Sequence, residues 1–216
     1  MRDRANICPC EHHPLEIRRD GHCKCVLFVG DNYDVERAYQ PRVETEDIAE
    51  TRSIRERCVT VYATRWCVMS RRPKALLRRR GVLFEDVDIE ADPAAARRVE
   101  VWNNGYRSVP PIVIRQIMAD PTMAELEGVL LERQATVMDC TVHVTSWCFH
   151  SRRTLRWLED HAIEAKAVDV EEDREAAQRV QEWNQGDLSV PTLDVTVRLT
   201  EPSGHALEAV LGLGTR

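Results

Sequence analysis

The chain repeats itself, and this duplication constrains the fold more than any other feature of the sequence. Trp66-Cys67 returns as Trp147-Cys148, 81 residues later. At the same offset, residues 58–135 align with residues 139–216 without a gap, and 28 of the 78 aligned pairs are identical. Chance does not produce such agreement, so we infer an internal duplication. Each copy has ~80 residues, enough for one small hydrophobic core.

The rest of the chain differs in composition from the two copies. Residues 1–39 hold four of the eight cysteines. Residues 40–57 are rich in Glu and Arg and poor in large apolar side chains, which is typical of a linker. We therefore expect a Cys-rich segment (1–39), a charged linker (40–57) and two domains, 58–135 and 136–216. We refer to these domains as repeat 1 and repeat 2.

Each repeat alternates strand-like and helix-like segments. In repeat 1 the pattern predicts strands over 58–63, 83–89 and 111–114, and helices over 68–80, over 94–103 and after residue 121. A short edge strand is expected between the third strand and the last helix. The predicted order is βαβαββα, an α/β fold. The first two strands are joined by a helix, so they should be parallel.

Composition excludes some partners and compartments. The net charge is −6, which argues against a nucleic-acid-binding protein. Because no apolar run approaches ~18 residues, we expect no membrane span. The first residues lack the apolar core of a secretory signal, so we expect a cytoplasmic protein. Cysteines in such a chain favour metal ligands or working thiols over structural disulfides.

Cys67 and Cys148 follow the first strand of each repeat, where a helix is predicted to begin. Free N–H groups at a helix N-terminus favour a negative charge, so a cysteine there is held partly as the reactive thiolate. Two basic residues follow one turn later in each repeat and would add to this effect: Arg71 and Arg72, and Arg152 and Arg153. The alternative is a small buried cysteine that only packs.

The motifs Trp-Cys-x-x-Ser and Ser-Val-Pro, with an Asp closing the second strand, resemble the glutaredoxin family and its mycoredoxin-like branch. The resemblance implies two tandem thioredoxin-fold domains, with Cys67 and Cys148 as nucleophiles. It implies cis-prolines facing them and backbone pairing of the preceding valine with a bound thiol peptide. It also implies that a hydroxyl residue near the last helix holds the carboxylate of glutathione or a mycothiol-like thiol. The residues concerned are Val109, Pro110, Val190, Pro191, Thr122 and Ser203.

Both repeats depart from the dithiol members of this family. Ser70 and Ser151 stand where those members have a second cysteine. Neither motif can close its own disulfide, so a second thiol must complete the exchange. Cys58 and Cys140 begin their strands, up to ~25 Å from the nucleophiles. We therefore expect both to be packing residues.

Cys8-Pro9-Cys10 and Cys23-Lys24-Cys25 form two close pairs of metal-ligand type. Four adjacent thiolates need a cation to offset their repulsion. The segment resembles the catalytic subunit of ferredoxin–thioredoxin reductase, which implies a [4Fe–4S] cluster with ferredoxin or another electron donor. Zinc is the alternative. Two of that family's six cysteines are missing here.

Three functions are compatible with these motifs. The first is a thiol–disulfide oxidoreductase acting on protein disulfides or mixed disulfides by a monothiol mechanism, with electrons supplied through the N-terminal segment. The second is a non-enzymatic iron–sulfur carrier or redox-sensing scaffold, in which the repeats share a [2Fe–2S] cluster. The third is a binding module without redox activity.

Overall fold

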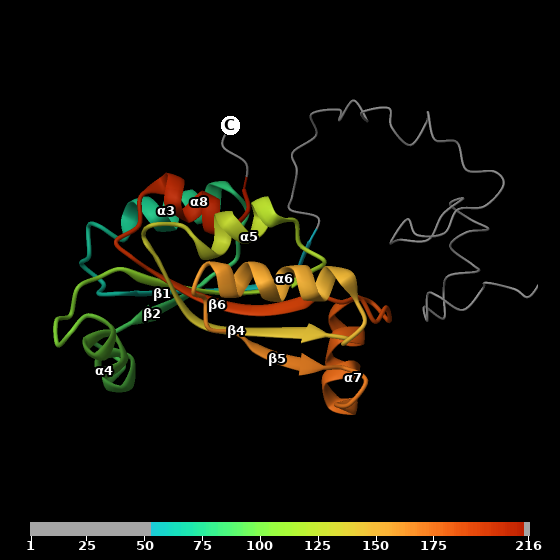
Figure 1. Ribbon diagram of the computed structural model, residues 1–216. Helices are drawn as coiled ribbons and strands as arrows, with labels where there is room; N and C mark the ends of the chain where they lie inside the picture. Colours follow the sequence, from blue (N-terminus) through green and yellow to red (C-terminus); the bar gives the residue numbers. More distant parts are fainter. Residues whose placement is uncertain (1–52, 214–216) are drawn as a thin grey trace, which may run out of the picture. The chain divides into compact units, whose positions relative to one another are not determined.

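Within residues 53–213, which the computed structural model describes, each repeat supplies three strands and three helices (Figure 1). The elements of repeat 1 are β1 (Ile54–Ala63), α3 (Arg71–Arg79), β2 (Glu85–Asp88), α4 (Pro93–Trp102), β3 (Pro111–Ala119) and α5 (Met123–Leu130). The strand β1 begins four residues earlier than predicted, within the expected linker, and we count residues 54–57 with repeat 1. Those of repeat 2 are β4 (Ala135–Val144), α6 (Phe149–Asp160), β5 (Lys166–Asp169), α7 (Arg174–Trp183), β6 (Thr192–Thr200) and α8 (Gly204–Val210).

All six strands join one sheet in the order β2-β1-β3-β6-β4-β5. The predicted parallel pairing is confirmed in both repeats, between β1 and β2 and between β4 and β5. The repeats meet where β3 pairs with β6 in antiparallel register. The two repeats are therefore not independent domains, because one sheet and one compact unit, Ile48–Arg216, contain both.

The third strand of each repeat is longer than predicted, and no separate edge strand follows it within residues 53–213. For β3 the reason is the absence of turn residues. After Pro111, β3 contains no Gly, Asn, Asp or Pro at which a hairpin would reverse. The strand therefore continues straight into the other repeat. In the glutaredoxin order a fourth strand would lie beside the third; here the distal half of the partner repeat's third strand occupies that place.

The pairing of β3 with β6 is symmetric. Arg115 lies opposite Thr196, and these two residues are counterparts in the duplication. On either side of this point, Pro111 pairs with Thr200 and Ala119 with Thr192. Each repeat thus gives its last half-strand and last helix to the other repeat. This is the geometry of a domain swap, here built into one chain.

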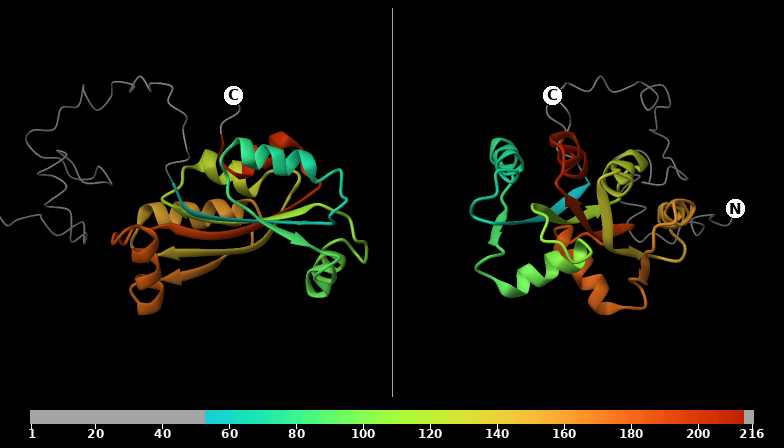
Figure 2. Two further views of the ribbon diagram at one scale, coloured as in Figure 1. Left: turned by 180° about the vertical axis from the view of Figure 1, so that it is seen from behind. Right: turned by 90° about the vertical axis from the view of Figure 1, so that its left-hand side faces the viewer.

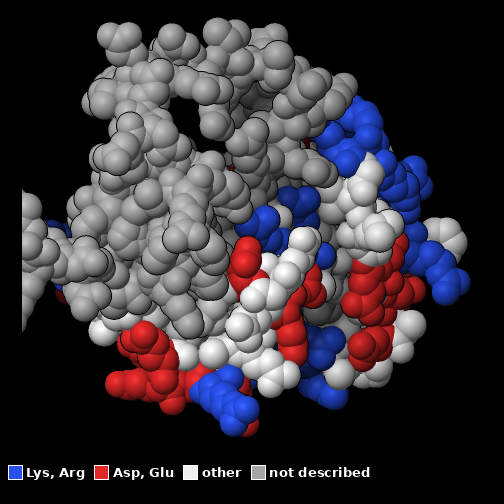
Figure 3. Space-filling view, turned by 90° about the vertical axis from the view of Figure 1, so that its right-hand side faces the viewer, with Lys and Arg blue, Asp and Glu red and all other residues white. Residues whose placement is uncertain are grey.

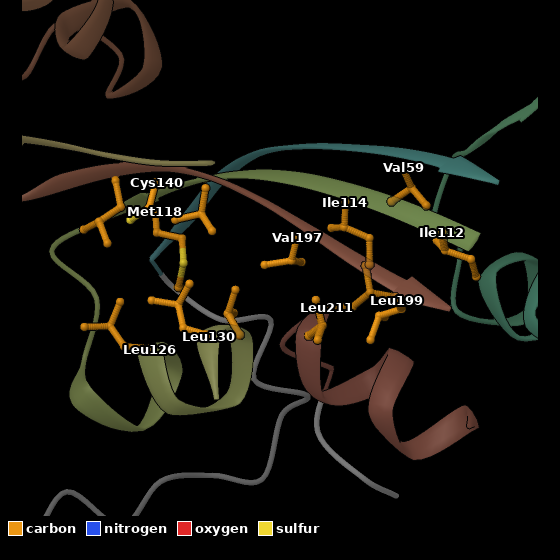
Figure 4. Close-up of a cluster of buried hydrophobic side chains, with 14 of the residues drawn as sticks. Val59, Ile112, Ile114, Met118, Leu126, Leu130, Cys140, Val197, Leu199 and Leu211 are labelled. Atoms are coloured by element: carbon orange, nitrogen blue, oxygen red, sulfur yellow. The ribbon is translucent and has the colours of Figure 1, made fainter. Parts of the chain in front are cut away.

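Four helices lie along one face of the sheet in the order α3, α8, α5, α6, whereas α4 and α7 cover opposite ends of the other face (Figure 2). Apolar residues from both repeats fill a common core beneath the four helices. Figure 4 shows Ile112 and Ile114 of β3 on the same side as Val197 and Leu199 of β6. Burial of this common core therefore holds the two repeats together.

Side chains of repeat 1 also cap the last helix of repeat 2. Gln116 is 1% exposed, and its Nε2 donates to the carbonyl oxygen of Val210 at 2.7 Å. Arg57 donates from Nη2 to the carbonyl of Leu211 and from Nε to Gln116 Oε1. The last carbonyls of a helix have no partner within it, so these two side chains satisfy the end of α8.

Charges on the surface are mixed. Figure 3 shows one end of the molecule, where acidic and basic side chains form separate small groups and neither sign covers the face. Among the described residues, no helix combines the length and the apolar character needed to cross a bilayer.

Candidate active sites

The site of repeat 2 places Cys148 at the start of a helix, as predicted. Cys148 is the N-cap of α6, and its Sγ accepts a hydrogen bond from the backbone N–H of Ser151 at 3.5 Å. The same Sγ lies 3.7 Å from the carbonyl oxygen of Val190, and the Val190–Pro191 peptide bond is cis. This partly exposed thiol therefore lies at the positive end of the helix dipole, which favours the thiolate.

The site of repeat 1 has the same strand and proline but a different helix start. Cys67 Sγ lies 3.7 Å from the carbonyl oxygen of Val109, and the Val109–Pro110 bond is cis. The helix α3, however, begins only at Arg71, with Ser70 as the N-cap residue. The prediction that the cysteine itself opens the helix is therefore wrong for repeat 1.

Pro73 explains the delayed start of α3. Proline has no N–H and disfavours helical geometry in the residue before it, so it is tolerated only in the first turn. Starting at Arg71 puts Pro73 at the third helical position, where an N–H has no partner in any case. Repeat 2 has Thr154 at the equivalent position and begins its helix at Phe149.

The four arginines expected to favour the thiolates lie in the first turns of α3 and α6, and all are exposed. Within residues 53–213, none of them forms an ion pair with a carboxylate. Their role beside the thiols stays a prediction. The residues are Arg71, Arg72, Arg152 and Arg153.

Two further cysteines lie in the sheet and do not reach the sites. Cys140 is 2% exposed in the main core (Figure 4), and burial, aided by Asp139 and Asp194, raises the pKa of its thiol to about 12. It packs as predicted. Cys58 is exposed on β1, so the same prediction is wrong for Cys58. The alternation of side chains along β1 turns Cys58 away from the core that holds Val59.

The two candidate nucleophiles lie at opposite ends of the sheet. Successive antiparallel pairings make β1 and β4 antiparallel to each other, and each cysteine follows the end of its strand. The nine residues of β3 separate the two prolines. At ~3.3 Å per residue the sites are about 30 Å apart. Cys67 and Cys148 therefore cannot form a disulfide with each other or share one iron–sulfur cluster within a chain.

Each site is completed by the other repeat, which the sequence analysis did not foresee. The backbone N–H of Glu201 donates to the carbonyl of Pro110 at 3.0 Å, and that of Asp120 donates to the carbonyl of Pro191 at 2.8 Å. The side chain of Asp120 also lies 3.0 Å from His150 Nδ1, two residues after Cys148. The missing turn in β3 was the only sequence signal for these contacts.

The two hydroxyl residues expected to hold a thiol carboxylate lie at the start of the two helices, α5 and α8, that the repeats swap. Thr122 is the N-cap of α5 and forms a capping box with Glu125. Ser203 is the N-cap of α8 and lines a groove beside Pro110 of repeat 1. Ser203 thus lies near the site of repeat 1 and not that of its own repeat. Carboxylate binding by these residues stays a prediction.

The expected metal ligands Cys8, Cys10, Cys23 and Cys25 lie outside the described residues. Within residues 53–213, no group of three or more His, Cys, Asp or Glu side chains is arranged to hold a metal ion.

Comparison with known proteins identifies the family. The glutaredoxin family profile matches residues 59–117 and 140–197, one match in each repeat. Two proteins of Mycobacterium tuberculosis are each 32% identical over 76 residues, which is 34% of this chain and 90% of theirs. They are named "Putative glutaredoxin MT3292" (strain CDC 1551 / Oshkosh) and "Putative glutaredoxin Rv3198A" (strain H37Rv). With both repeats matched over more than half of the sequence, the chain belongs to the glutaredoxin family.

Proposed function

We propose that the protein reduces mixed disulfides by a monothiol mechanism at two independent sites, Cys67 and Cys148. Glutaredoxins act in general on protein disulfides or mixed disulfides. The observation that supports the monothiol proposal is that, among residues 53–213, neither thiol has a second cysteine within reach. Ser70 and Ser151 replace the second cysteine of each motif, Cys140 is buried in the core, and the sites are about 30 Å apart.

The proposed reaction proceeds in two exchanges. The thiolate of Cys67 or Cys148 attacks the sulfur of the low-molecular-weight thiol in a mixed disulfide. A disulfide forms between this cysteine and the small thiol. The thiolate of the substrate protein leaves with the electron pair and takes up a proton. A second molecule of the small thiol, as thiolate, attacks this intermediate. It releases the oxidised small thiol as a dimer and restores the cysteine thiolate.

Single and double replacements of the two cysteines by serine test this proposal in the full-length protein. We expect Cys67→Ser and Cys148→Ser each to keep the activity of the remaining site and the double variant to lose all activity. Glutathione and mycothiol mixed disulfides are offered in parallel, because the sequence does not distinguish them. Mass spectrometry should find one small-thiol adduct per active site. Turnover in the double variant would disprove the proposal.

We further propose that Cys8, Cys10, Cys23 and Cys25 bind an iron–sulfur cluster, with [4Fe–4S] favoured over zinc, and that this cluster receives electrons from ferredoxin or another donor in the cytoplasm. The donor set supports the proposal, because clustered thiolates bind such centres. Anaerobic purification with an optical spectrum and metal analysis tests it. Visible absorbance that survives serine replacement of all four cysteines would contradict it.

A further inference from the structure

A groove of about 630 Å³ begins beside Pro110, next to the Cys67 site, and follows one side of α3. One wall comes from repeat 1 and includes Arg72, Leu76 and Arg79. The opposite wall comes from repeat 2 and includes Glu201 and Gly204. Its volume falls within the range of ligand-binding clefts. The strand exchange thus creates a groove that neither repeat forms alone.

The counterpart positions in repeat 2 carry larger side chains. Trp157 stands where repeat 1 has Leu76, and Met123 of repeat 1 stands where repeat 2 has Gly204. Both Trp157 and Met123 are partly buried and pack against the main core. At Gly204, by contrast, an added Cβ would lie 3.8 Å from the Leu76 side chain, so the glycine leaves space there. The surroundings of Cys148 are therefore more filled than those of Cys67.

The charges of the groove also differ between the sites. Within residues 53–213, neither Arg72 nor Arg79 pairs with a carboxylate. Glu201 supplies one negative charge on the opposite wall. The counterpart of Arg79 in repeat 2 is Asp160, which reverses the charge at that position. Arg153 and Arg156 stand at the counterparts of Arg72 and Ala75, so each site has two arginines. The acids differ: Glu201 alone lines the groove beside Cys67, whereas Asp120 and Asp160 stand at the counterpart positions beside Cys148.

The spacing of the two arginines sets the size of the ligand. They are seven residues apart on one helix, which is about 10 Å along the axis. An extended polypeptide covers this distance with about three residues. We propose that the groove binds an acidic segment flanking the disulfide of a protein substrate, so that Cys67 and Cys148 act on different substrates. This inference rests on the thiol exchange proposed above.

Two synthetic peptides test the inference with the full-length protein. Each contains one cysteine activated as a 2-pyridyl disulfide, flanked by Asp and Glu in one peptide and by Lys in the other. The Cys67 thiolate attacks the peptide sulfur, a protein–peptide disulfide forms, and pyridine-2-thione leaves with the electron pair and takes up a proton. After an acid quench, mass spectrometry of the digested protein gives the rate of adduct formation at Cys67 and Cys148 separately.

We expect the acidic peptide to react with Cys67 about five-fold faster than the basic peptide, which corresponds to two exposed ion pairs. At Cys148 the two rates should be similar. The Arg72→Gln/Arg79→Gln double variant should bring the ratio at Cys67 close to one. Arg97→Gln, which removes an exposed arginine of α4 outside the groove, should leave the ratio unchanged.

A second variant tests the shape of the groove from the other repeat. Gly204→Met copies the side chain found at the counterpart position, and we expect it to slow the acidic peptide at Cys67 at least three-fold. The small reagent 2,2′-dithiodipyridine should react with Cys67 as before. Equal peptide ratios at both thiols, or a ratio at Cys67 that survives loss of both arginines, would overturn the inference alone. Failure of both thiols to form any adduct would instead overturn the proposed function and the inference with it.

Discussion

The contacts of Gln116 at the end of α8 allow one quantitative test of how the repeats hold each other. Gln116 belongs to repeat 1, yet its Nε2 satisfies the carbonyl of Val210 in repeat 2, and its Oε1 accepts from Arg57. The duplication itself provides the replacement, because the counterpart of Gln116 is the buried Val197. The variant Gln116→Val removes both hydrogen bonds and keeps a residue suited to a buried strand.

The expected cost follows from three contributions. A buried carbonyl without a donor costs about 2 kcal/mol, and loss of the bond from the charged Arg57 costs about 1.5 kcal/mol. Burial of the valine side chain returns about 1.5 kcal/mol. The free energy of unfolding should therefore fall by about 2 kcal/mol.

Urea denaturation followed by circular dichroism measures this change. With a slope of about 2 kcal/mol per molar urea, the midpoint should move down by about 1 M. The exposed Gln178 of α7 offers a control, since Gln178→Ala should change stability by less than about 0.5 kcal/mol. A shift for Gln116→Val as small as that of the control would show that α8 does not depend on repeat 1 for its end.

Four further predictions concern single features. Cys140, with its pKa raised to about 12 from 9.0 by burial, should resist alkylation at pH 8 until the protein is denatured; the contribution of this thiol to stability should be constant below about pH 8 and be lost as the pH rises from 9 toward 12, because the unfolded state loses the proton first. Burial lowers the pKa of His143 in the folded protein, so the contribution of this residue to stability should fall as the pH drops below 6.5; His143→Tyr, the residue found at its counterpart Tyr62, should remove this dependence in pH-dependent melting curves. Pro73→Thr should let α3 begin earlier and raise the rate of iodoacetamide labelling at Cys67 about two- to five-fold, and an unchanged rate would refute our account of the helix start. Residues 53–134 and 135–213, produced as separate chains, should fold only together and elute from a size-exclusion column as a one-to-one complex. A folded monomer of either half would contradict the swap of strand and helix between the repeats.

The local elements followed from the sequence because their signals are local. β-branched runs predicted β1, and Gly81 ends the segment that contains α3. Helix–strand alternation then predicted parallel pairing, because a helical crossover permits little else. The candidate thiols and their prolines were found by motif, and the duplication supplied each observation twice.

The swap of strand and helix between the repeats was not predicted, because no sequence motif indicates which partner a strand such as β3 will pair with. A strand without turn residues, such as β3, can end, bend or continue, and only the available partner decides among these. Here β6 offers an equally long strand with matching alternation, and the common core makes the pairing favourable. The later start of α3 has a local cause, because Pro73 is tolerated only in the first turn of a helix.

The link between Arg57 and Leu211 spans most of the described chain, and it bears on how the protein is made. Repeat 1 lacks β6, the partner on the other side of β3 from β1, and lacks α8, the helix beside α3, until the last residues of repeat 2 have been synthesised. Folding of repeat 1 during synthesis therefore stops at a partly assembled sheet with an open edge until β6 and α8 have emerged from the ribosome. Such distant pairing is slow to form and exposes apolar surface in the meantime. For this protein, the interval between the synthesis of repeat 1 and that of β6 and α8 is the period in which chaperones matter most.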